Sequence, residues 1–448
     1  MTRSHASPLA RLFTSAAVIE PYEMKAVILS FIYFAFLMAS YFVLRPLRDA
    51  MGTVYGVSHL QDLFTGTFVV SFLFAPVYAG LASRVKLSNF LPWVYGFIAL
   101  TMLVFYALFA RVAHDRWVAA AFYVWVSTFN ILTISVFWSL MADTFSRTQA
   151  KRLFGVVAAG GTLGTVAGPA ITTLFVNLVG TNTLLLISAG GFVVTAWLVR
   201  LLEREKQKLR ALGDAQETTL DRTLAGNPFD GFSLLFKSRY LLLLSLFILL
   251  MTWISTIVYF QLGDSISKAF ASREARTQAY AVIDLIVNGA AFFIQLFGTG
   301  RIIRRYGVTT GLLLNPVIMV TAFLSIAFSP VLMVLASMQV FRRVAEYAVA
   351  KPTREMLFTV VDQESKYKAK NVIDTVIYRF GDVSSAWFSA AVLPYGVAGL
   401  AISGIVVSAI WFPIALMLGR QYEHVRSGQL VGNLATEERP RHGGSLAP

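Results

Sequence analysis

The residues best suited to do chemistry in this sequence are charged side chains that interrupt long apolar runs. Arg45, Arg48 and Asp49 have the spacing i, i+3 and i+4, which places them on one face of a helix. A guanidinium group can hold phosphate or carboxylate oxygens through paired, charge-assisted hydrogen bonds. If the helix continues past Pro46, we expect this face to line a water-filled cavity that binds an anion. The alternative is that Pro46 ends the helix and both arginines simply reach the surrounding water.

A second group of charges lies in the middle of another apolar run. Arg342 and Glu346 are four residues apart, so they can pair along one helical face, whereas Arg343 points about 100° away and needs a different partner. We favour a cavity site for an anionic group that includes both arginines. A purely structural Arg–Glu pair between helices is the alternative.

Further charges complete the candidate site. Asp374, Arg379 and Asp382 lie in one apolar segment, and Asp284 and Asn288 lie one turn apart in another. Carboxylates beside arginines can hold a gate closed, exchange partners with a substrate or carry protons. Asp143 precedes the basic pair Lys151-Arg152 and is a candidate loop anchor, while Arg354 follows the run that contains Arg342. The candidate anion-binding residues are Arg45, Arg48, Arg342, Arg343, Arg354 and Arg379, and the candidate gating or proton-coupling carboxylates are Asp49, Asp143, Asp284, Glu346, Asp374 and Asp382.

Two aromatic rings lie beside these charges. Tyr41 is one turn before Arg45, and Tyr378 directly precedes Arg379. Either ring is a candidate for stacking on a nucleobase. The alternative is that they belong to the lipid-facing bulk and the interfacial belts that account for most of the 36 Phe, 17 Tyr and 8 Trp.

The composition shows what kind of elements must position these residues. Of the 448 residues, 56% are hydrophobic and only 14% charged, and the mean hydropathy is +0.66. This is the composition of a polytopic membrane protein, because soluble domains carry roughly 25% charged residues. The net charge of +14 does not indicate a nucleic-acid partner, since the basic residues punctuate apolar runs. The absence of cysteine, of metal-ligand spacing among the five histidines and of a Walker A loop argues against an enzyme, an ATP-driven pump or a bound cofactor.

Twelve segments are long and apolar enough to cross a bilayer as helices. They cover residues 26–48, 62–82, 90–110, 117–142, 152–178, 182–200, 239–261, 277–299, 309–328, 330–350, 371–393 and 397–419. Of the 38 Lys and Arg residues, 28 lie on the side of the two termini, 7 on the other side and 3 within spans. The positive-inside rule therefore predicts that both termini are cytoplasmic, in a bacterial inner membrane.

The sequence also predicts two six-helix halves. The proposed organisation is an N-terminal tail (1–25), a first half (26–202), a cytoplasmic linker (203–238), a second half (239–419) and a C-terminal tail (420–448). A short surface helix is expected over 232–237 in the linker. A weak repeat relates the halves, since Gly80 and Arg84 recur as Gly300 and Arg304 at a shift of 220. This plan is that of major facilitator transporters, an all-α class of membrane protein.

The charged segments resemble the ATP:ADP antiporters, nucleotide transporters of intracellular bacteria and plastids. The first helix ends in Arg45-Pro46-Leu47-Arg48-Asp49, with Arg48 where the family commonly has lysine, and the fifth begins near Lys151-Arg152-Leu153-Phe154. Pro352-Thr353-Arg354-Glu355 is similar to an element that ends the family's tenth helix, and Lys370, Asp374, Arg379 and Gly381 match the motif that follows it. The resemblance implies a facilitator-like fold, nucleotide exchange, and phosphate contacts by Arg48 and Arg354.

The leading functional hypothesis is a secondary transporter that works as a monomer and exchanges a phosphorylated, nucleotide-like anion by alternating access. In this hypothesis Arg48 of the first half and Arg354 or Arg379 of the second approach the cargo from opposite sides. The alternative is a proton-coupled facilitator that exports another organic molecule, with Asp284 or Asp374 carrying the proton. Counterflow with ATP would favour the first hypothesis, and a requirement for a pH gradient the second.

Overall fold

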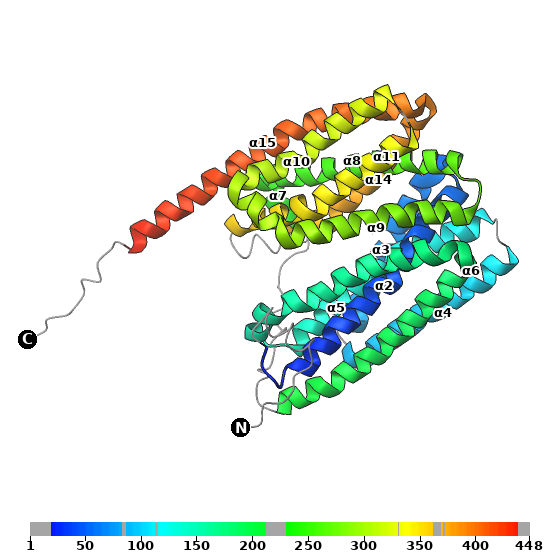
Figure 1. Cartoon of the computed structure of the whole chain (residues 1–448). Helices are drawn as coiled ribbons and strands as arrows, with labels where there is room; N and C mark the ends of the chain where they lie inside the picture. The colour runs from blue at the N-terminus through cyan, green and yellow to red at the C-terminus, as the bar shows by residue number, and fades with distance from the viewer. Residues whose placement is uncertain are drawn as a thin grey trace, which may run out of the picture. The chain divides into compact units, whose positions relative to one another are not determined.

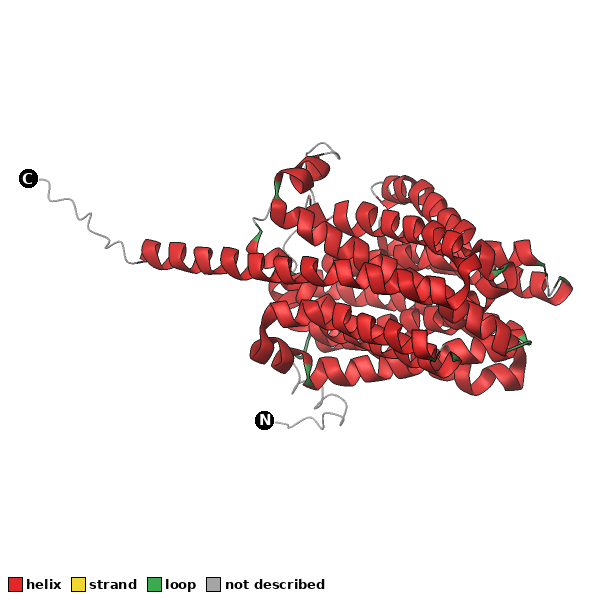
Figure 2. Cartoon of the chain, turned by 90° about the horizontal axis from the view of Figure 1, so that it is seen from above, coloured by secondary structure: helices red, strands yellow, loops and turns green. Residues whose placement is uncertain are grey.

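The computed structural model describes residues 19–82, 87–112, 115–211, 230–329, 331–361, 369–370 and 372–437, and these residues form helices and loops without a strand (Figure 2). The longer helices are α2 (Met24–Tyr55), α3 (Leu60–Ala82), α4 (Leu87–Arg111), α5 (Arg116–Thr144), α6 (Arg147–Ala211), α8 (Arg239–Ala269), α9 (Arg273–Phe297), α10 (Thr299–Phe328), α11 (Leu332–Ala345), α14 (Tyr378–Val392) and α15 (Gly396–Glu437). The shorter ones are η1 (Val57–His59), α7 (Asp230–Lys237), η2 (Glu346–Ala350), α12 (Lys351–Leu357), η3 (Phe358–Val360), η4 (Ile373–Ile377) and η5 (Leu393–Tyr395).

Every predicted span coincides with helix in the described part of the chain, which confirms the all-α class. By length and composition, nine helical stretches among the described residues can cross a membrane. Two of them are long enough for two spans each. One covers Thr148–Leu209 and bends at Gly180, whose φ of 77° favours glycine, and the other covers Tyr378–Gly428. The number of crossings stays a prediction.

The chain forms two compact units. Unit 1 contains residues 1–225 and 259–290, and unit 2 contains residues 226–258 and 291–448. The end of α8 and most of α9 therefore belong to unit 1 by their contacts, although both helices follow the predicted linker in sequence. The division of the chain into two six-helix halves stays a prediction about topology.

In unit 1, α2 packs closely along α6 (Figure 1). Glycines spaced four residues apart on α6 permit the approach, as is common between membrane helices. A Cβ atom on Gly160 would lie 2.2 Å from the backbone oxygen of Phe31, and one on Gly164 would lie 2.3 Å from that of Ala35. This close contact fixes the height and rotation of α2, which has Arg45 and Arg48 on its second half.

Helix α2 continues through Pro46 to Tyr55. The alternative that Pro46 ends the helix is therefore wrong. Hydrogen bonds from α6 support this part of α2, since Thr172 Oγ1 donates to the Val43 carbonyl at 3.1 Å and Ser188 Oγ to the Ser40 carbonyl at 2.8 Å. In unit 2, α10 packs along α15, and α11 leads through the π-helical turn η2 into α12.

Candidate functional site

Arg48 lies at the centre of the charged cluster of unit 1. Its Nε and Nη2 both donate to Oδ1 of Asp49, at 3.0 and 2.6 Å. Its Nη1 donates to the Tyr41 hydroxyl at 3.5 Å and to Ser127 Oγ at 3.4 Å, and its guanidinium carbon lies 5.3 Å from the centre of the Tyr123 ring. The side chains of Arg48 and Asp49 are 15% and 7% exposed. The pair is thus largely buried and internally neutralised.

A residue from α8 completes this cluster. The Tyr259 hydroxyl donates to Asp49 Oδ1 at 3.1 Å, and the Tyr259 ring packs edge-on against Phe64 of α3. Asp49 therefore accepts from α2 and α8 at the same oxygen. This contact joins residues 210 positions apart in sequence.

Arg45 makes the second charged contact of unit 1. Its Nε lies 3.6 Å from Oδ2 of Asp284 on α9, and its guanidinium stacks over the Phe42 ring at 5.4 Å. One turn after Asp284, the Asn288 amide donates to the Thr165 carbonyl of α6 at 3.0 Å. Asp284 and Asn288, which the sequence places one turn apart, thus contact α2 and α6 respectively.

A line of polar contacts continues from there along α9. Arg276 donates to Thr53 Oγ1 at 3.2 Å and to the backbone carbonyls of Phe270 and Ser267. The remaining contacts are Thr181 Oγ1 with Glu274 at 3.0 Å, Asn177 with Gln278 at 2.7 Å, and Arg273 with Asn182 at 2.9 Å. Within unit 1, residues 259–290 are therefore held to α2 and α6 by hydrogen bonds and ion pairs as well as by buried apolar side chains such as Phe260 and Val287.

The charged cluster of unit 2 is built on α11 and η2. Arg342 Nη1 lies 2.8 Å from Glu346 Oε2, as the i, i+4 spacing predicts, and both side chains are less than 10% exposed. Arg342 also donates to Ser255 of α8 at 2.6 Å and to Gln339 at 3.1 Å. These hydrogen bonds satisfy a charge that would otherwise be costly to bury.

Arg343 is buried beside this pair and points to a different partner. Its guanidinium carbon lies 5.5 Å from the centre of the Tyr347 ring, and Lys351 Nζ lies 4.3 Å from the same ring. Tyr347 belongs to η2, where the helix widens by one residue per turn. Such π-helical turns are frequent at functional sites because they redirect side chains.

A second group of charges in unit 2 surrounds Arg354 of α12. Arg354 Nη2 lies 3.8 Å from Asp374 and 3.5 Å from Glu355, and Lys370 pairs with both carboxylates. Burial alone raises the pKa of the Glu355 carboxyl, but the hydrogen bond and charge of Lys370 and the charge of Arg354 outweigh burial and lower this pKa below its ordinary value. Asp374 is the second residue of the other π-helical turn, η4.

The other candidate residues lie at different places. Arg379 and Asp382 pair at 3.4 Å on α14, next to the half-buried Tyr378. Asp143, at the end of α5, pairs with Lys206 of α6 and is a structural anchor. The Tyr41 ring is 4% exposed and packs against Phe129.

Sequence reasoning missed several partners. Ser255 and Gln339 contact Arg342, and Tyr259 contacts Asp49, yet each is a single polar residue in an apolar stretch of helix. The fully buried Glu23 binds Arg152 and Gln149 on α6 at 2.8 and 3.0 Å, and nothing in the spacing of these residues indicates the contact. Among the described residues, no group of His, Cys, Asp and Glu could hold a metal ion.

Both units therefore hold arginines paired with internal carboxylates, with 2.6–3.8 Å between the charged atoms. A polyphosphate offers several oxygens that match guanidinium groups. Loss of one partner costs more free energy in these pairs than in exposed surface pairs, because an arginine without a counter-charge is strongly disfavoured where water is excluded. Pairs of this kind are chemically suited to exchange a carboxylate for another anion.

Comparison with known proteins adds independent information. A sequence profile described as the Major Facilitator Superfamily matches residues 26–345. ADP,ATP carrier protein 1 of Chlamydia pneumoniae is 23% identical, with 94% of this chain and 96% of that protein covered, and its counterpart from Chlamydia muridarum is 22% identical, with 85% and 84% covered.

Solved structures share the fold at low sequence identity. An inward-facing bacterial homologue of the human lysosomal transporter Spinster has a TM-score of 0.59 at 15% identity, with 91% of this chain and 99% of that chain covered. The nucleoside transporter NupG has a TM-score of 0.55 at 15% identity, with 89% and 98% covered.

Proposed function

Because the chain belongs to the Major Facilitator Superfamily, we propose that it is a secondary transporter that exchanges nucleotide-like phosphorylated anions across a membrane by alternating access. The observation that carries the proposal is the near full-length similarity to ADP,ATP carriers, supported by the ion pairs that Arg45, Arg48 and Arg354 form with carboxylates. The chain is a carrier and not an enzyme.

In this proposal, cargo phosphates bind the arginines in place of their internal partners. Arg48 exchanges Asp49 for a phosphate oxygen, and Arg354 exchanges Asp374 in the same way. A charge-assisted hydrogen bond contributes about 1.5–3 kcal/mol, so replacing a carboxylate by a phosphate on one arginine is close to neutral and reversible. Reversible binding is what a carrier needs in order to release its cargo.

The same replacement couples binding to movement. Asp49 also accepts from Tyr259 of α8, and Arg45 binds Asp284 of α9. A phosphate that takes Arg48 and Arg45 weakens two contacts that hold residues 259–290 to α2. Without cargo the pairs reform, which disfavours movement of an empty carrier and favours exchange over net transport.

The proton-coupled exporter is not favoured. Both candidate proton carriers are engaged in ion pairs, Asp284 with Arg45 and Asp374 with Arg354 and Lys370. The relatives named above are ADP,ATP carriers, and exchange of two nucleotides needs no proton. Asp284 and Asp374 then act as gating and positioning residues.

The transporter works in a bacterial inner membrane as a monomer, without a nucleic-acid partner and with both termini in the cytoplasm. The 28 basic residues on the side of the termini support this orientation. Fusions of a reporter that is active only in the cytoplasm, placed after Thr218 and after Gly428, should both be active. Periplasmic activity of either fusion would contradict the topology.

Transport of nucleotides is tested by counterflow in proteoliposomes. Vesicles loaded with unlabelled ATP should take up labelled ADP, and the uptake should not depend on an imposed pH gradient. Vesicles loaded with a nucleoside serve as the control, since a nucleoside lacks the phosphates that the arginines bind. Uptake that needs the gradient and ignores the internal nucleotide would support the proton-coupled exporter instead.

A further inference from the structure

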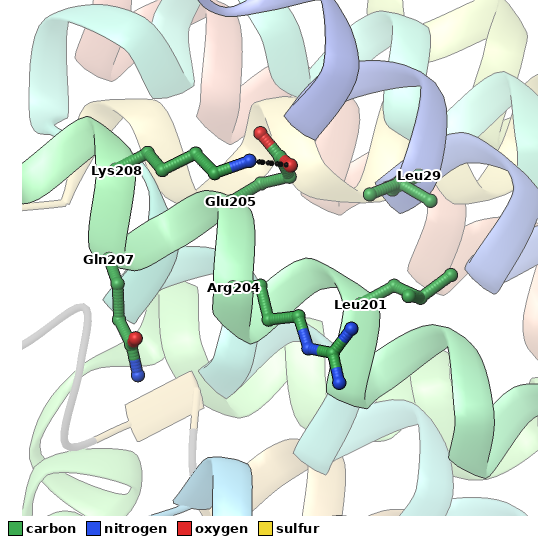
Figure 3. A pocket seen from close by; sticks show the side chains of 6 residues that line it. All are labelled: Leu29, Leu201, Arg204, Glu205, Gln207 and Lys208. Atoms are coloured by element: carbon green, nitrogen blue, oxygen red, sulfur yellow. Dashed lines mark hydrogen bonds and ion pairs between the residues drawn. The ribbon is translucent and has the colours of Figure 1, made fainter.

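A groove of about 680 Å³ opens on unit 1 between the beginning of α2 and the last turns of α6 (Figure 3). The described residues that line it are Leu29 from α2 and Leu201, Arg204, Glu205, Gln207 and Lys208 from α6. Leu29 and Arg48 are 19 residues apart on α2, which corresponds to roughly 28 Å along the helix. The groove is therefore separate from the arginine clusters.

The lining changes from apolar to basic along α6. Leu201, Arg204, Glu205 and Lys208 have the spacing i, i+3, i+4 and i+7, which places them on one helical face. Leu201 and Lys208 are separated by roughly 10 Å along the axis. The headgroup layer on each side of a bilayer is about 5–8 Å thick, so this face passes from hydrocarbon depth into the headgroups.

An aromatic residue marks the same boundary. Trp197 lies one turn before Leu201 on α6 and is 56% exposed. Exposed tryptophan is enriched where a helix leaves the hydrocarbon core, because the ring is amphipathic. The predicted sixth span ends at residue 200, in agreement with this position.

The groove also has an excess of positive charge. Arg204 makes no hydrogen bond or ion pair with any other described residue, and Lys208 contacts Glu205 at 2.7 Å (Figure 3). Lys25 is exposed one turn before Leu29 on α2. In contrast, Lys206 on the other face of α6 is buried and paired with Asp143 and Glu203. The described lining therefore holds two cations, Arg204 and Lys208, against the single carboxylate of Glu205.

We propose that this groove binds an anionic phospholipid. Arg204 and Lys208 contact the lipid phosphate, the Gln207 amide donates to the polar headgroup, and an acyl chain lies along Leu29 and Leu201. A soluble phosphate would meet the same cations but would leave the apolar wall without an occupant. The predicted topology places this site in the cytoplasmic leaflet, whose negative surface potential adds to the attraction.

The proposal is tested by native mass spectrometry of the detergent-solubilised full chain, titrated with phosphatidylglycerol or phosphatidylcholine. The wild-type chain should bind phosphatidylglycerol more tightly. Each basic residue removed should weaken this binding by about five-fold, so that Arg204→Gln shows one such loss and Arg204→Gln/Lys208→Gln shows two. Arg301→Gln/Arg305→Gln is the matched control, because both arginines are exposed at the beginning of α10.

Three results would overturn the proposal. Equal binding of the two lipids would mean that the headgroup charge is not recognised. An equal loss in the control variant would indicate general attraction to a basic protein. Displacement of the lipid by millimolar inorganic phosphate would show that the ligand is a soluble anion.

Discussion

Replacement of Glu346 by glutamine should destabilise unit 2 more than any exposed charge change. Glu346 binds Arg342 at 2.8 Å and is close enough to Lys351, Arg343 and Arg354 to interact with their charges. Its loss leaves the buried guanidinium groups of Arg342 and Arg343 without this carboxylate. Removing one partner of a buried pair costs about 3–5 kcal/mol, which corresponds to a decrease in melting temperature on the order of 10 °C.

Two further variants distinguish the contribution of the Arg342–Glu346 pair to stability from the contributions of the neighbouring charges. Arg342→Gln should cost less than Glu346→Gln, because it reduces the positive charge near Glu346. The double variant Arg342→Gln/Glu346→Gln should recover part of the stability, since removing both charges avoids an isolated one. A stable double variant that does not transport would show that the pair binds cargo.

The assay is thermal unfolding of the purified protein in detergent, followed by tryptophan fluorescence. Glu423→Gln is the matched control, because Glu423 and Arg426 form an exposed pair on α15 with 3.9 Å between the charged atoms. Exposed pairs contribute about 0–1 kcal/mol, so this variant should melt near the wild type. Equal melting temperatures for Glu346→Gln and Glu423→Gln would refute the reasoning.

Three other perturbations follow from the contacts. Gly164→Leu should prevent α2 from packing on α6 and abolish the folded peak in size-exclusion chromatography, whereas Gly190→Leu, where a Cβ atom meets nothing within 4 Å, should not. Tyr259→Phe removes a donor to Asp49 and should change the rate of nucleotide exchange while leaving the melting temperature nearly unchanged. The lowered pKa of Glu355 stabilises the fold at neutral pH, and this contribution is lost as the pH falls through the folded-state pKa. The melting temperatures of wild type and Glu355→Gln should therefore converge in acid.

The sequence predicted what depends on local spacing. Apolar runs of sufficient length located the helices, and the i, i+4 spacing identified the pair of Arg342 and Glu346. The spacing of Arg45, Arg48 and Asp49 identified one charged face on α2. In each case the helical period of 3.6 residues decides which residues share a face, and this does not depend on tertiary contacts.

Contacts between distant segments could not be predicted in this way. Asp284 is the partner of Arg45 and Ser255 is a partner of Arg342, and no periodicity relates these residues. The sequence around Pro46 does not determine whether α2 continues, because packing on α6 stabilises a helix that proline alone would weaken. The apolar pattern also does not predict the π-helical turn at Glu346–Ala350, since one extra residue in a turn hardly changes the spacing of apolar residues.

The central claim is that arginines of this carrier bind cargo phosphates, and ATP counterflow with variants of Arg48 tests it most directly. Loss of one charge-assisted hydrogen bond lowers affinity roughly ten- to a hundred-fold, so Arg48→Gln should abolish exchange at low nucleotide concentration. The substitution also leaves the buried Asp49 carboxylate without its cation, so exchange is measured with protein that elutes as a folded peak in size-exclusion chromatography. Arg48→Lys should retain part of the activity, and Arg116→Gln, an exposed arginine at the beginning of α5, should retain all of it. Wild-type exchange by Arg48→Gln, or no exchange of any phosphorylated solute by the wild type, would contradict the account.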